Sequence, residues 1–467
     1  MTRVVIIGGG PGGYEAALVG CQLGGEVTIV DSDGLGGSAV LTDCVPSKTL
    51  IATAEVMTEV RDSNALGLRF GPTGQGSVES SVHVDLGAVN SRVLELARSQ
   101  SADIVERLLG ESVRLVIGKG RLDGLDRVRV QTDGGEEVLA ADVILVATGA
   151  SPRELPEARP DGERILTWTQ VYDLRSLPER LIVVGSGVTG AEFASAYHAL
   201  GSDVVLVSSR DRVLPGEDAD AAQVLEDVFG RRGLTVLGRS RAAAVTRDGD
   251  QVTVRLTDGR QVTGSHCLLA VGSVPNTSGI GLEEAGVTLD RGGFITVDKV
   301  SRTSARGIYA AGDCTGVLML ASVAAMQGRI AMWHTLGEAV SPLDLKTVSS
   351  NVFTAPEIAT VGVSQKQVDA GEVPAKAVTL PLRGNARAKM QGNRDGFVKL
   401  FCRPATGIVV GGVVVSPRAS ELIYAVSLAV AERLTVDQVS ESFTVYPSLT
   451  GSIGEAARRL RGSRTIS

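Results

Sequence analysis

Short apolar runs alternate along this chain with glycine-rich turns and helical patterns. Almost wholly apolar runs, typical of strands buried on both faces of a sheet, occupy residues 3–7, 27–30, 143–146, 181–184 and 204–207. Two of these runs lead through a glycine turn into a stretch with helical periodicity, such as residues 14–18. The pattern predicts an α/β fold.

Length, charge and composition narrow the class of protein. The chain has 467 residues, more than one hydrophobic core usually serves, so we expect about three domains. A net charge of -7 argues against a nucleic-acid partner. No apolar run approaches the roughly 18 residues that cross a bilayer, and the N-terminus lacks a signal-peptide layout. We therefore expect a cytoplasmic protein without an integral membrane segment. Its five cysteines and four histidines lack metal-ligand spacing, so no metal site is predicted.

The first glycine turn has the full context of a dinucleotide-binding fingerprint. Gly8, Gly10 and Gly13 lie between an apolar run and a helical pattern, and Asp31 ends the next apolar run, 23 residues after Gly8. Gly8 permits a tight turn, Gly10 lets a pyrophosphate approach the backbone, and Gly13 lets the helix lie close to the sheet. Asp31 is expected to accept hydrogen bonds from a ribose.

A second glycine turn predicts a second dinucleotide. Its glycines are Gly185, Gly187 and Gly190. The ribose position is Ser208 instead of an acid, and Ser209 and Arg210 follow it. Hydroxyl groups and a guanidinium can bind a 2′-phosphate that a carboxylate would repel. We expect NADPH to be used and preferred over NADH; alternatively, Arg210 is a solvated loop residue and either nicotinamide cofactor serves.

Residues 36–48 resemble the redox-active segment of the flavoprotein disulfide reductases, whose pattern is GGxCxxxxCxPSK. Ala39 stands where that pattern has its first cysteine, whereas Cys44 retains the second. One thiol cannot perform dithiol exchange. Cys44 would lie beside the flavin, where it tunes the flavin, pairs with it as a thiolate or is oxidised; the alternative is a small packed residue.

The resemblance covers essentially the whole chain and implies its domains. It implies Rossmann-like FAD and NAD(P) domains followed by a C-terminal α+β interface domain that pairs two subunits head to tail in a homodimer. FAD would be bound by residues 1–150 and 276–344, NAD(P) by residues 151–275, and the partner subunit by residues 345–467. Residues 396–400 and 408–415 fit strands of an antiparallel interface sheet, or ordinary core.

Further cofactor contacts are implied by motifs of the same family. Thr148 and Gly149 match its ATG crossover, and Gly272 lies in the return crossover, where Ser273 replaces an arginine. Gly312 and Asp313 look like the second FAD motif, with Asp313 on ribityl or phosphate-linked hydroxyls. The remaining implied cofactor contacts are Pro11, Gly12, Gly120, Leu320 and Ala321.

Lys48 and Glu192 match two charged family positions. There they form an ion pair near flavin N5, where a cation stabilises reduced flavin and the nicotinamide stacks. The resemblance therefore implies catalytic roles for both side chains. The alternative is two surface charges near helix starts.

The proton relay of the family is missing. Tyr446 replaces the catalytic histidine, and Gly451 replaces the glutamate that supports it. A phenol with a pKa near 10 is poorly matched to proton exchange with a thiol at neutral pH. From the partner subunit, Tyr446 could contact an electron acceptor; an aromatic packing role is the alternative.

The retained and lost residues together predict a function. The residues of the reductive half-reaction are retained, so NAD(P)H would reduce FAD. The electrons would then pass from the flavin to a quinone. The combination resembles actinobacterial members of this superfamily that lack the redox cysteine pair and reduce quinones with NAD(P)H. The alternatives are a dihydrolipoyl dehydrogenase-like enzyme, a nicotinamide nucleotide transhydrogenase or oxidase, and a redox-sensing FAD-binding protein.

Overall fold

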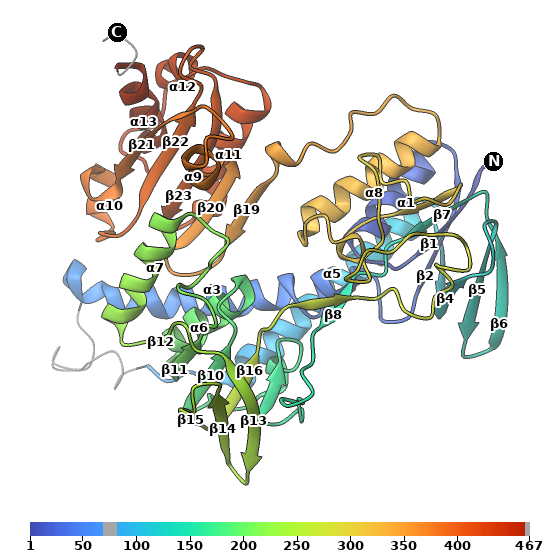
Figure 1. Cartoon of the computed structure of the whole chain (residues 1–467), viewed down its shortest axis with the longest axis horizontal. Coiled ribbons are helices and arrows are strands. Elements are labelled where there is room, and N and C mark those ends of the chain that lie inside the picture. Colours follow the sequence, from blue (N-terminus) through green and yellow to red (C-terminus); the bar gives the residue numbers. More distant parts are fainter. Residues whose placement is uncertain (69–81, 463–467) are drawn as a thin grey trace. The chain divides into compact units, whose positions relative to one another are not determined.

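The structure is a computed structural model that describes residues 1–68 and 82–462 (Figure 1). The chain divides into two compact units. The first comprises Met1–Thr49, Asn90–Arg153 and Gly272–Asp344. The second comprises Leu50–Val89, Glu154–Val271 and Leu345–Ser467. The predicted division into four segments at residues 150, 275 and 344 is not tested by these units and stays a prediction.

The first unit is built on a parallel five-stranded sheet in the order β18-β7-β1-β2-β3. Its strands are β1 (Arg3–Ile7), β2 (Glu26–Asp31), β3 (Arg114–Ile117), β7 (Val143–Val146) and β18 (Ile308–Ala310). Ile6 lies opposite Ile29 on one side and Leu145 on the other. The apolar runs are strands of this sheet because structure covers both of its faces.

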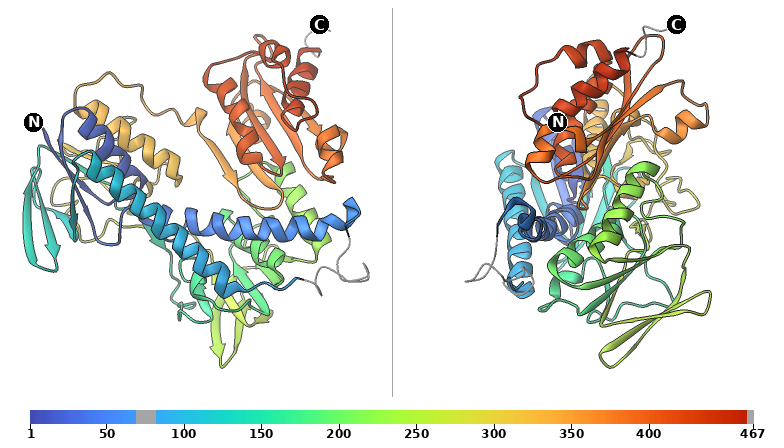
Figure 2. Two further views of the ribbon diagram at one scale, coloured as in Figure 1. Left: turned by 180° about the vertical axis from the view of Figure 1, so that it is seen from behind. Right: turned by 90° about the vertical axis from the view of Figure 1, so that its left-hand side faces the viewer.

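Helices cover one face of this sheet and a small antiparallel sheet covers the other. On the helical face, α1 (Pro11–Gln22) and α8 (Ala321–Thr335) run side by side (Figure 2). They approach so closely that a Cβ atom on Gly328 would lie 2.1 Å from the Gly12 carbonyl oxygen. The other face packs against β4 (Lys119–Leu122), β5 (Arg127–Thr132) and β6 (Gly135–Ala140).

The second unit contains a second parallel sheet, in the order β12-β11-β10-β16-β9. Its strands are β9 (Ile165–Thr167), β10 (Arg180–Val184), β11 (Asp203–Val207), β12 (Thr235–Leu237) and β16 (His266–Leu269). An antiparallel sheet packs against it, formed by β13 (Ala242–Asp248), β14 (Gln251–Leu256) and β15 (Gln261–Gly264). The predicted pair of Rossmann-like folds is therefore confirmed.

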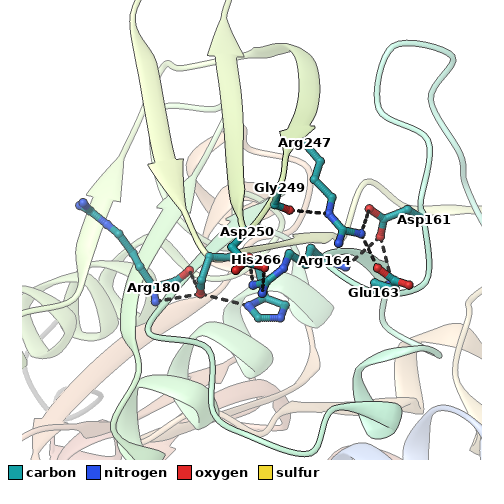
Figure 3. A network of polar contacts seen from close by, with 9 residues as sticks. Asp161, Glu163, Arg164, Arg180, Arg247, Gly249, Asp250 and His266 are labelled. Atoms are coloured by element: carbon teal, nitrogen blue, oxygen red, sulfur yellow. Dashed lines mark hydrogen bonds and ion pairs between the residues drawn. The ribbon is translucent and has the colours of Figure 1, made fainter.

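A polar network lies at the amino end of this second parallel sheet (Figure 3). Arg247 donates to Asp161 at 3.1 Å and to Glu163 at 2.6 Å. Burial and the neighbouring Arg164 guanidinium lower the pKa of His266 to about 4, so this imidazole is neutral at physiological pH. The network lies at the opposite end of the strands from the second glycine turn, and we assign it a structural role.

The C-terminal part of the second unit is an antiparallel sheet in the order β19-β20-β23-β22-β21. Its strands are β19 (Ser349–Val352), β20 (Glu357–Gly362), β21 (Lys376–Pro381), β22 (Phe397–Cys402) and β23 (Val409–Ser416). The strands predicted at residues 396–400 and 408–415 are confirmed. One face of the sheet packs against α11 (Ala419–Ala431) and α13 (Gly451–Gly462).

A buried cation joins two parts of the second unit. Lys399 of β22 is 2% exposed, and its ammonium lies 2.8 Å from Asp218 and 2.7 Å from Asp220. Asp218 also accepts hydrogen bonds from the first backbone N–H groups of α7 (Ala219–Arg232). Pairing the ammonium offsets the cost of burying it, so Lys399 fixes α7 against the C-terminal sheet.

Candidate functional site

The first glycine turn shows which glycines the fold itself requires. Gly8 has a φ of 107°, and a Cβ atom there would lie 2.2 Å from the Ala147 carbonyl oxygen. A Cβ atom on Gly13 would lie 1.9 Å from the Gly8 carbonyl oxygen. At Gly10 the nearest atom is the Gly37 Cα, at 3.9 Å, so the chain itself tolerates a side chain there. Glycine at this position therefore fits the close approach of a ligand.

The same turn leaves a helix start available to an anion. Gly10 caps α1 without a side-chain hydrogen bond, and Pro11 and Gly12 follow it. The Asp31 carboxylate accepts hydrogen bonds from the backbone N–H groups of Gly9 at 2.6 Å, Gly34 at 2.7 Å and Asp33 at 2.8 Å. Asp31 thus holds the turn, with acceptor capacity left for one further hydroxyl donor.

The segment that resembles the redox motif lies directly against this turn. The backbone N–H of Gly36 donates to the Gly9 carbonyl oxygen at 2.8 Å. Ala39 lies in the short helix α2 (Gly37–Leu41), and Cys44 is the first residue of α3 (Cys44–Asp62). None of the five cysteines, all of which lie in the described ranges, forms a disulfide.

Charged groups gather in the first unit where α3 begins. Burial raises the pKa of the Asp43 carboxyl, and the charge of Lys48 opposes this shift. Burial and the neighbouring Asp43 raise the pKa of Asp313 to about 6. The charge of Asp43 therefore couples electrostatically to both Lys48 and Asp313.

Gln327 positions the Gly312–Asp313 turn. It was not among the site residues predicted from the sequence. Its side chain is 2% exposed, and its carbonyl oxygen accepts a 2.8 Å hydrogen bond from the Gly312 backbone N–H. Gly312 itself has a φ of 85°, which favours glycine. Leu320 caps the start of α8 and Ala321 is its first residue, and Gln327 follows later in the same helix.

The two predicted crossovers lie together in the first unit. Strands β8 (Ala150–Pro152) and β17 (Ser273–Pro275) pair antiparallel. Asn276 donates through its side chain to the Thr148 carbonyl oxygen at 3.0 Å and through its backbone to that of Gly149, also at 3.0 Å. Gly272 accepts a 2.9 Å hydrogen bond from the Arg153 backbone.

Gly120 lies elsewhere in the first unit, in β4, where its contact with a cofactor stays a prediction. Its Cβ position is 3.1 Å from Val30 and 3.2 Å from Ile7. The residue thus lies against β1 and β2, the strands that bear the first glycine turn and Asp31.

The second glycine turn repeats the signature of the first. A Cβ atom on Gly185 would lie 2.1 Å from the Ala270 carbonyl oxygen. A Cβ atom on Gly190 would lie 1.8 Å from the Gly185 carbonyl oxygen. Apart from Ser186 and Val188 next to it in the chain, no described residue has an atom within 4 Å of a Cβ atom on Gly187, whose φ is -71°. Gly187 caps α6 (Val188–Leu200) without a side-chain hydrogen bond. Both turns therefore fit a dinucleotide pyrophosphate.

The residues after β11 differ in their access to a ribose. Ser208 is fully buried, and its hydroxyl lies 2.6 Å from that of Ser186 and accepts from the Arg210 backbone N–H at 3.1 Å. Ser209 and Arg210 are exposed, and Arg212 and Arg239 are exposed beside them. The exposed Arg210 and Arg212 side chains, more than the buried Ser208 hydroxyl, can therefore contact a phosphate.

Glu192 is buried in α6, and its exposed fraction is 3%. Its Oε1 atom accepts a 2.8 Å hydrogen bond from the backbone N–H of Phe353, just beyond β19. One turn later, Ser195 accepts from the Ala355 backbone N–H at 3.2 Å. Lys48 belongs to the first unit and Glu192 to the second, so the ion pair between them stays a prediction.

Tyr446 lies on the surface of the second unit. Its exposed fraction is 86%, and Phe443 and Val445 beside it are exposed by 106% and 79%. Gly451, at the position of the family's supporting glutamate, begins α13. The segment places an aromatic ring and a phenol at the surface with few contacts within its own chain.

The described part of the chain shows neither a membrane-spanning helix nor a metal-binding cluster. Within residues 1–68 and 82–462, none of the helices combines the length and apolar character that a bilayer crossing requires. The same residues contain no group of three or more His, Cys, Asp or Glu side chains arranged to hold a metal ion.

Two family models match the chain. Residues 2–328 match the model described as pyridine nucleotide-disulphide oxidoreductase. Residues 348–457 match the model of the dimerisation domain of the same family. Together the two matches include both glycine turns, the segment around Cys44 and Tyr446.

Known proteins resemble this chain along nearly its full length. A Mycobacterium tuberculosis protein named NAD(P)H dehydrogenase (quinone) is 57% identical, with 98% of this chain and 94% of the relative covered. A Zymomonas mobilis dihydrolipoyl dehydrogenase is 33% identical, with 97% and 96% covered. The crystal structure of LpdA from Mycobacterium tuberculosis superposes with a TM-score of 0.93 at 57% identity, covering 98% of this chain and 100% of that one.

Proposed function

Because this chain belongs to the pyridine nucleotide-disulphide oxidoreductase family, we propose that it oxidises NAD(P)H at a bound FAD and passes the electrons to quinones. The observation that carries the proposal is the single thiol of its redox segment: Ala39 occupies the position of the first cysteine and Cys44 that of the second, in an otherwise retained nucleotide-binding frame. The name of the 57% identical Mycobacterium tuberculosis relative supports the same acceptor class.

The first unit would hold FAD. The open position at Gly10 and the uncapped start of α1 suit the pyrophosphate. Asp31 would accept a hydrogen bond from the adenosine ribose, and Asp313 from ribityl or phosphate-linked hydroxyls. Gln327 would keep the Gly312–Asp313 turn in place for that contact. Bound FAD would supply two-electron chemistry between a nicotinamide and an acceptor.

The second unit would hold the nicotinamide cofactor. Gly187 and the start of α6 suit its pyrophosphate. We propose NADPH, because Ser209 and Arg210 are exposed where a 2′-phosphate would lie and no carboxylate stands at position 208. Ser208 would support that site indirectly by binding the Arg210 backbone.

Glu192 and Lys48 would act where the two cofactors meet. A cation at Lys48 would favour the negative charge of a reduced flavin. Glu192 would orient Lys48, and its bond to Phe353 fixes the carboxylate in one position. The overall reaction balances as NAD(P)H, a proton and a quinone yielding NAD(P)⁺ and a hydroquinone.

We propose a homodimer in which Tyr446 reaches the partner's acceptor site. The exposed side chains of Phe443, Val445 and Tyr446 lie in the region that matches the dimerisation domain. Large apolar side chains that are exposed close together in the sequence, as here, suit a subunit contact. Tyr446 would then line the acceptor site or donate a hydrogen bond to a quinone oxygen.

An acceptor screen tests the proposed function. The purified protein is supplied with NADPH or NADH, and a naphthoquinone, lipoamide, oxygen or a second pyridine nucleotide is offered as acceptor. We expect quinone reduction and no lipoamide reduction, because one thiol cannot exchange with a disulfide and be regenerated. Lipoamide reduction without quinone reduction would overturn the proposal, and transfer to the second nucleotide alone would favour a transhydrogenase.

A further inference from the structure

The second unit contains a cavity that lies apart from both glycine turns. Its volume is about 1600 Å³, and its lining includes residues of α3, the end of α7, and the segments 383–395 and 447–450. Eight arginine or lysine side chains and five carboxylates line it. This local excess of positive charge occurs in a chain whose net charge is -7, so it requires an explanation.

Two of the cations are already paired within the cavity wall. Arg231 lies 2.6 Å from Asp395, and Arg232 lies 3.5 Å from Asp62. Burial raises the pKa of Glu55, and the charge of a further arginine, Arg418, only partly opposes this rise.

Two more glutamates stand near Glu55, and their charges raise its pKa. They are Glu357 and Glu59, and Glu357 also accepts a 2.8 Å hydrogen bond from the Ser420 backbone N–H. The carboxylates of the lining therefore interact mainly with other residues of the cavity wall.

One segment supplies four cations without such partners. Arg383, Arg387, Lys389 and Arg394 are all exposed, and none forms an ion pair with any residue of the described ranges. Arg387 and Lys389 lie in the short helix α10 (Ala386–Met390), and Arg383 and Arg394 flank it. Four like charges within 12 residues repel one another, so an anion placed among them would be favoured.

Asn385 ties this cationic segment to the segment of Tyr446. Its side-chain Nδ2 atom donates to the Ser448 carbonyl oxygen at 2.9 Å and to the Ser452 hydroxyl at 2.8 Å. Its Oδ1 atom caps α10 by accepting from the Ala388 backbone N–H at 3.1 Å. Arg383 and Arg387 therefore keep a fixed relation to the chain two residues beyond Tyr446.

We propose that these cations select the electron acceptor, so that quinones bearing a negatively charged substituent are favoured. The inference rests on the proposed function, in which Tyr446 lies at the partner's acceptor site. If Tyr446 reaches that site, the hydrogen bonds of Asn385 place Arg383 and Arg387 near the same site. The guanidinium groups then bind a sulfonate or carboxylate on the quinone, and they counter the repulsion of an anion by the net negative subunits.

The test compares kcat/KM for two acceptors, 1,2-naphthoquinone-4-sulfonate and the neutral menadione, in the intact FAD-loaded dimer. The double substitution Arg383→Gln and Arg387→Gln is compared with Arg403→Gln, a control in the exposed β22–β23 turn outside the cavity. Comparing variant with parent for each acceptor cancels the difference in redox potential between the two quinones.

We expect the double variant to lose about tenfold in kcat/KM for the sulfonate, mostly through KM, and little for menadione. Added salt should reduce the parent enzyme's rate with the sulfonate and leave the variant's unchanged. Equal losses for both quinones, or none for the sulfonate, would overturn the inference while leaving quinone reduction intact. Failure to reduce either quinone would instead refute the proposed function, and an unchanged unfolding temperature excludes misfolding.

Discussion

The Oε1 atom of Glu192 lies 2.8 Å from the backbone nitrogen of Phe353, within a site where the Glu192 side chain is 3% exposed. The carboxylate of α6 therefore satisfies a backbone donor at the edge of the C-terminal sheet. Ser195 repeats the contact one turn later with Ala355. A residue proposed to act on electron transfer thus also has a measurable structural role.

Two substitutions separate these roles of Glu192. Glu192→Gln keeps an oxygen acceptor for Phe353 and removes the charge, whereas Glu192→Ala removes both. We expect Glu192→Ala to lower the free energy of unfolding by about 1–3 kcal/mol and Glu192→Gln by much less. Both should slow flavin reduction by NADPH, measured by stopped-flow absorbance. Wild-type flavin reduction in Glu192→Gln would show that the charge has no part in the reaction.

Restoring the missing cysteine should not restore disulfide reduction. In Ala39→Cys the two thiols can pair, but Tyr446 and Gly451 still replace the proton relay. We expect no lipoamide turnover from Ala39→Cys, and measurable turnover when Tyr446→His and Gly451→Glu are added. Titration of free thiols checks that the new disulfide forms. Lipoamide turnover by the single variant would mean that the relay is dispensable here.

Asp313 predicts a pH dependence of the cofactor-free protein. Its pKa is raised from the ordinary 3.8 to about 6, so the folded state binds its proton more tightly than the unfolded state does. The group therefore reduces stability as pH rises from 4 to 6, by on the order of 3 kcal/mol once fully ionised. Asp313→Asn should raise unfolding free energy at pH 7.5 and not at pH 4.5, as measured with urea.

Binding of FAD should reverse the sign of that effect. Hydroxyl groups that donate to the Asp313 carboxylate favour its ionised form, so FAD affinity is expected to rise with pH between 5 and 7. In Asp313→Asn the affinity should be weaker and independent of pH in this range. Fluorescence titration of the apoprotein measures both constants, and a parallel pH profile in parent and variant would contradict this role.

The Lys399–Asp218 pair should govern the stability of the second unit. Lys399→Met leaves Asp218, whose side chain is 3% exposed, without its cation, and we expect a loss of about 3–5 kcal/mol. Asp220→Asn is a matched control, because that side chain is 66% exposed and should contribute less than about 1 kcal/mol. Chemical denaturation gives both values, and similar losses in the two variants would contradict the assignment.

The sequence could predict the nucleotide-binding frame because its signals are local. An apolar run followed by spaced glycines specifies a strand, a turn and a helix, as at Gly8 and Gly185. The structure adds a distinction that spacing cannot make: Gly8 and Gly13 are required by the chain's own packing, whereas Gly10 is not. Only the three-dimensional structure distinguishes a glycine that the fold requires from one that suits a ligand.

Other features depend on contacts between distant segments and escape local patterns. Gln327 was not among the predicted site residues, yet it holds the Gly312 turn across 15 residues of sequence. Ser208 fits the ribose position by spacing, but Ser186 engages its hydroxyl. Lys399 sits in an apolar strand, and its partner Asp218 lies 181 residues away. Such long-range polar pairs are set by tertiary packing, which one sequence does not reveal.

The central claim is that electrons leave from the flavin and not through a disulfide. The direct measurement is anaerobic: NADPH is added to the FAD-loaded protein with its thiols alkylated, and a naphthoquinone is then mixed in while the flavin absorbance is followed. Our account predicts that the bleached flavin regains its oxidised spectrum as fast as steady-state turnover requires. A flavin that stays reduced after the quinone is added would contradict it.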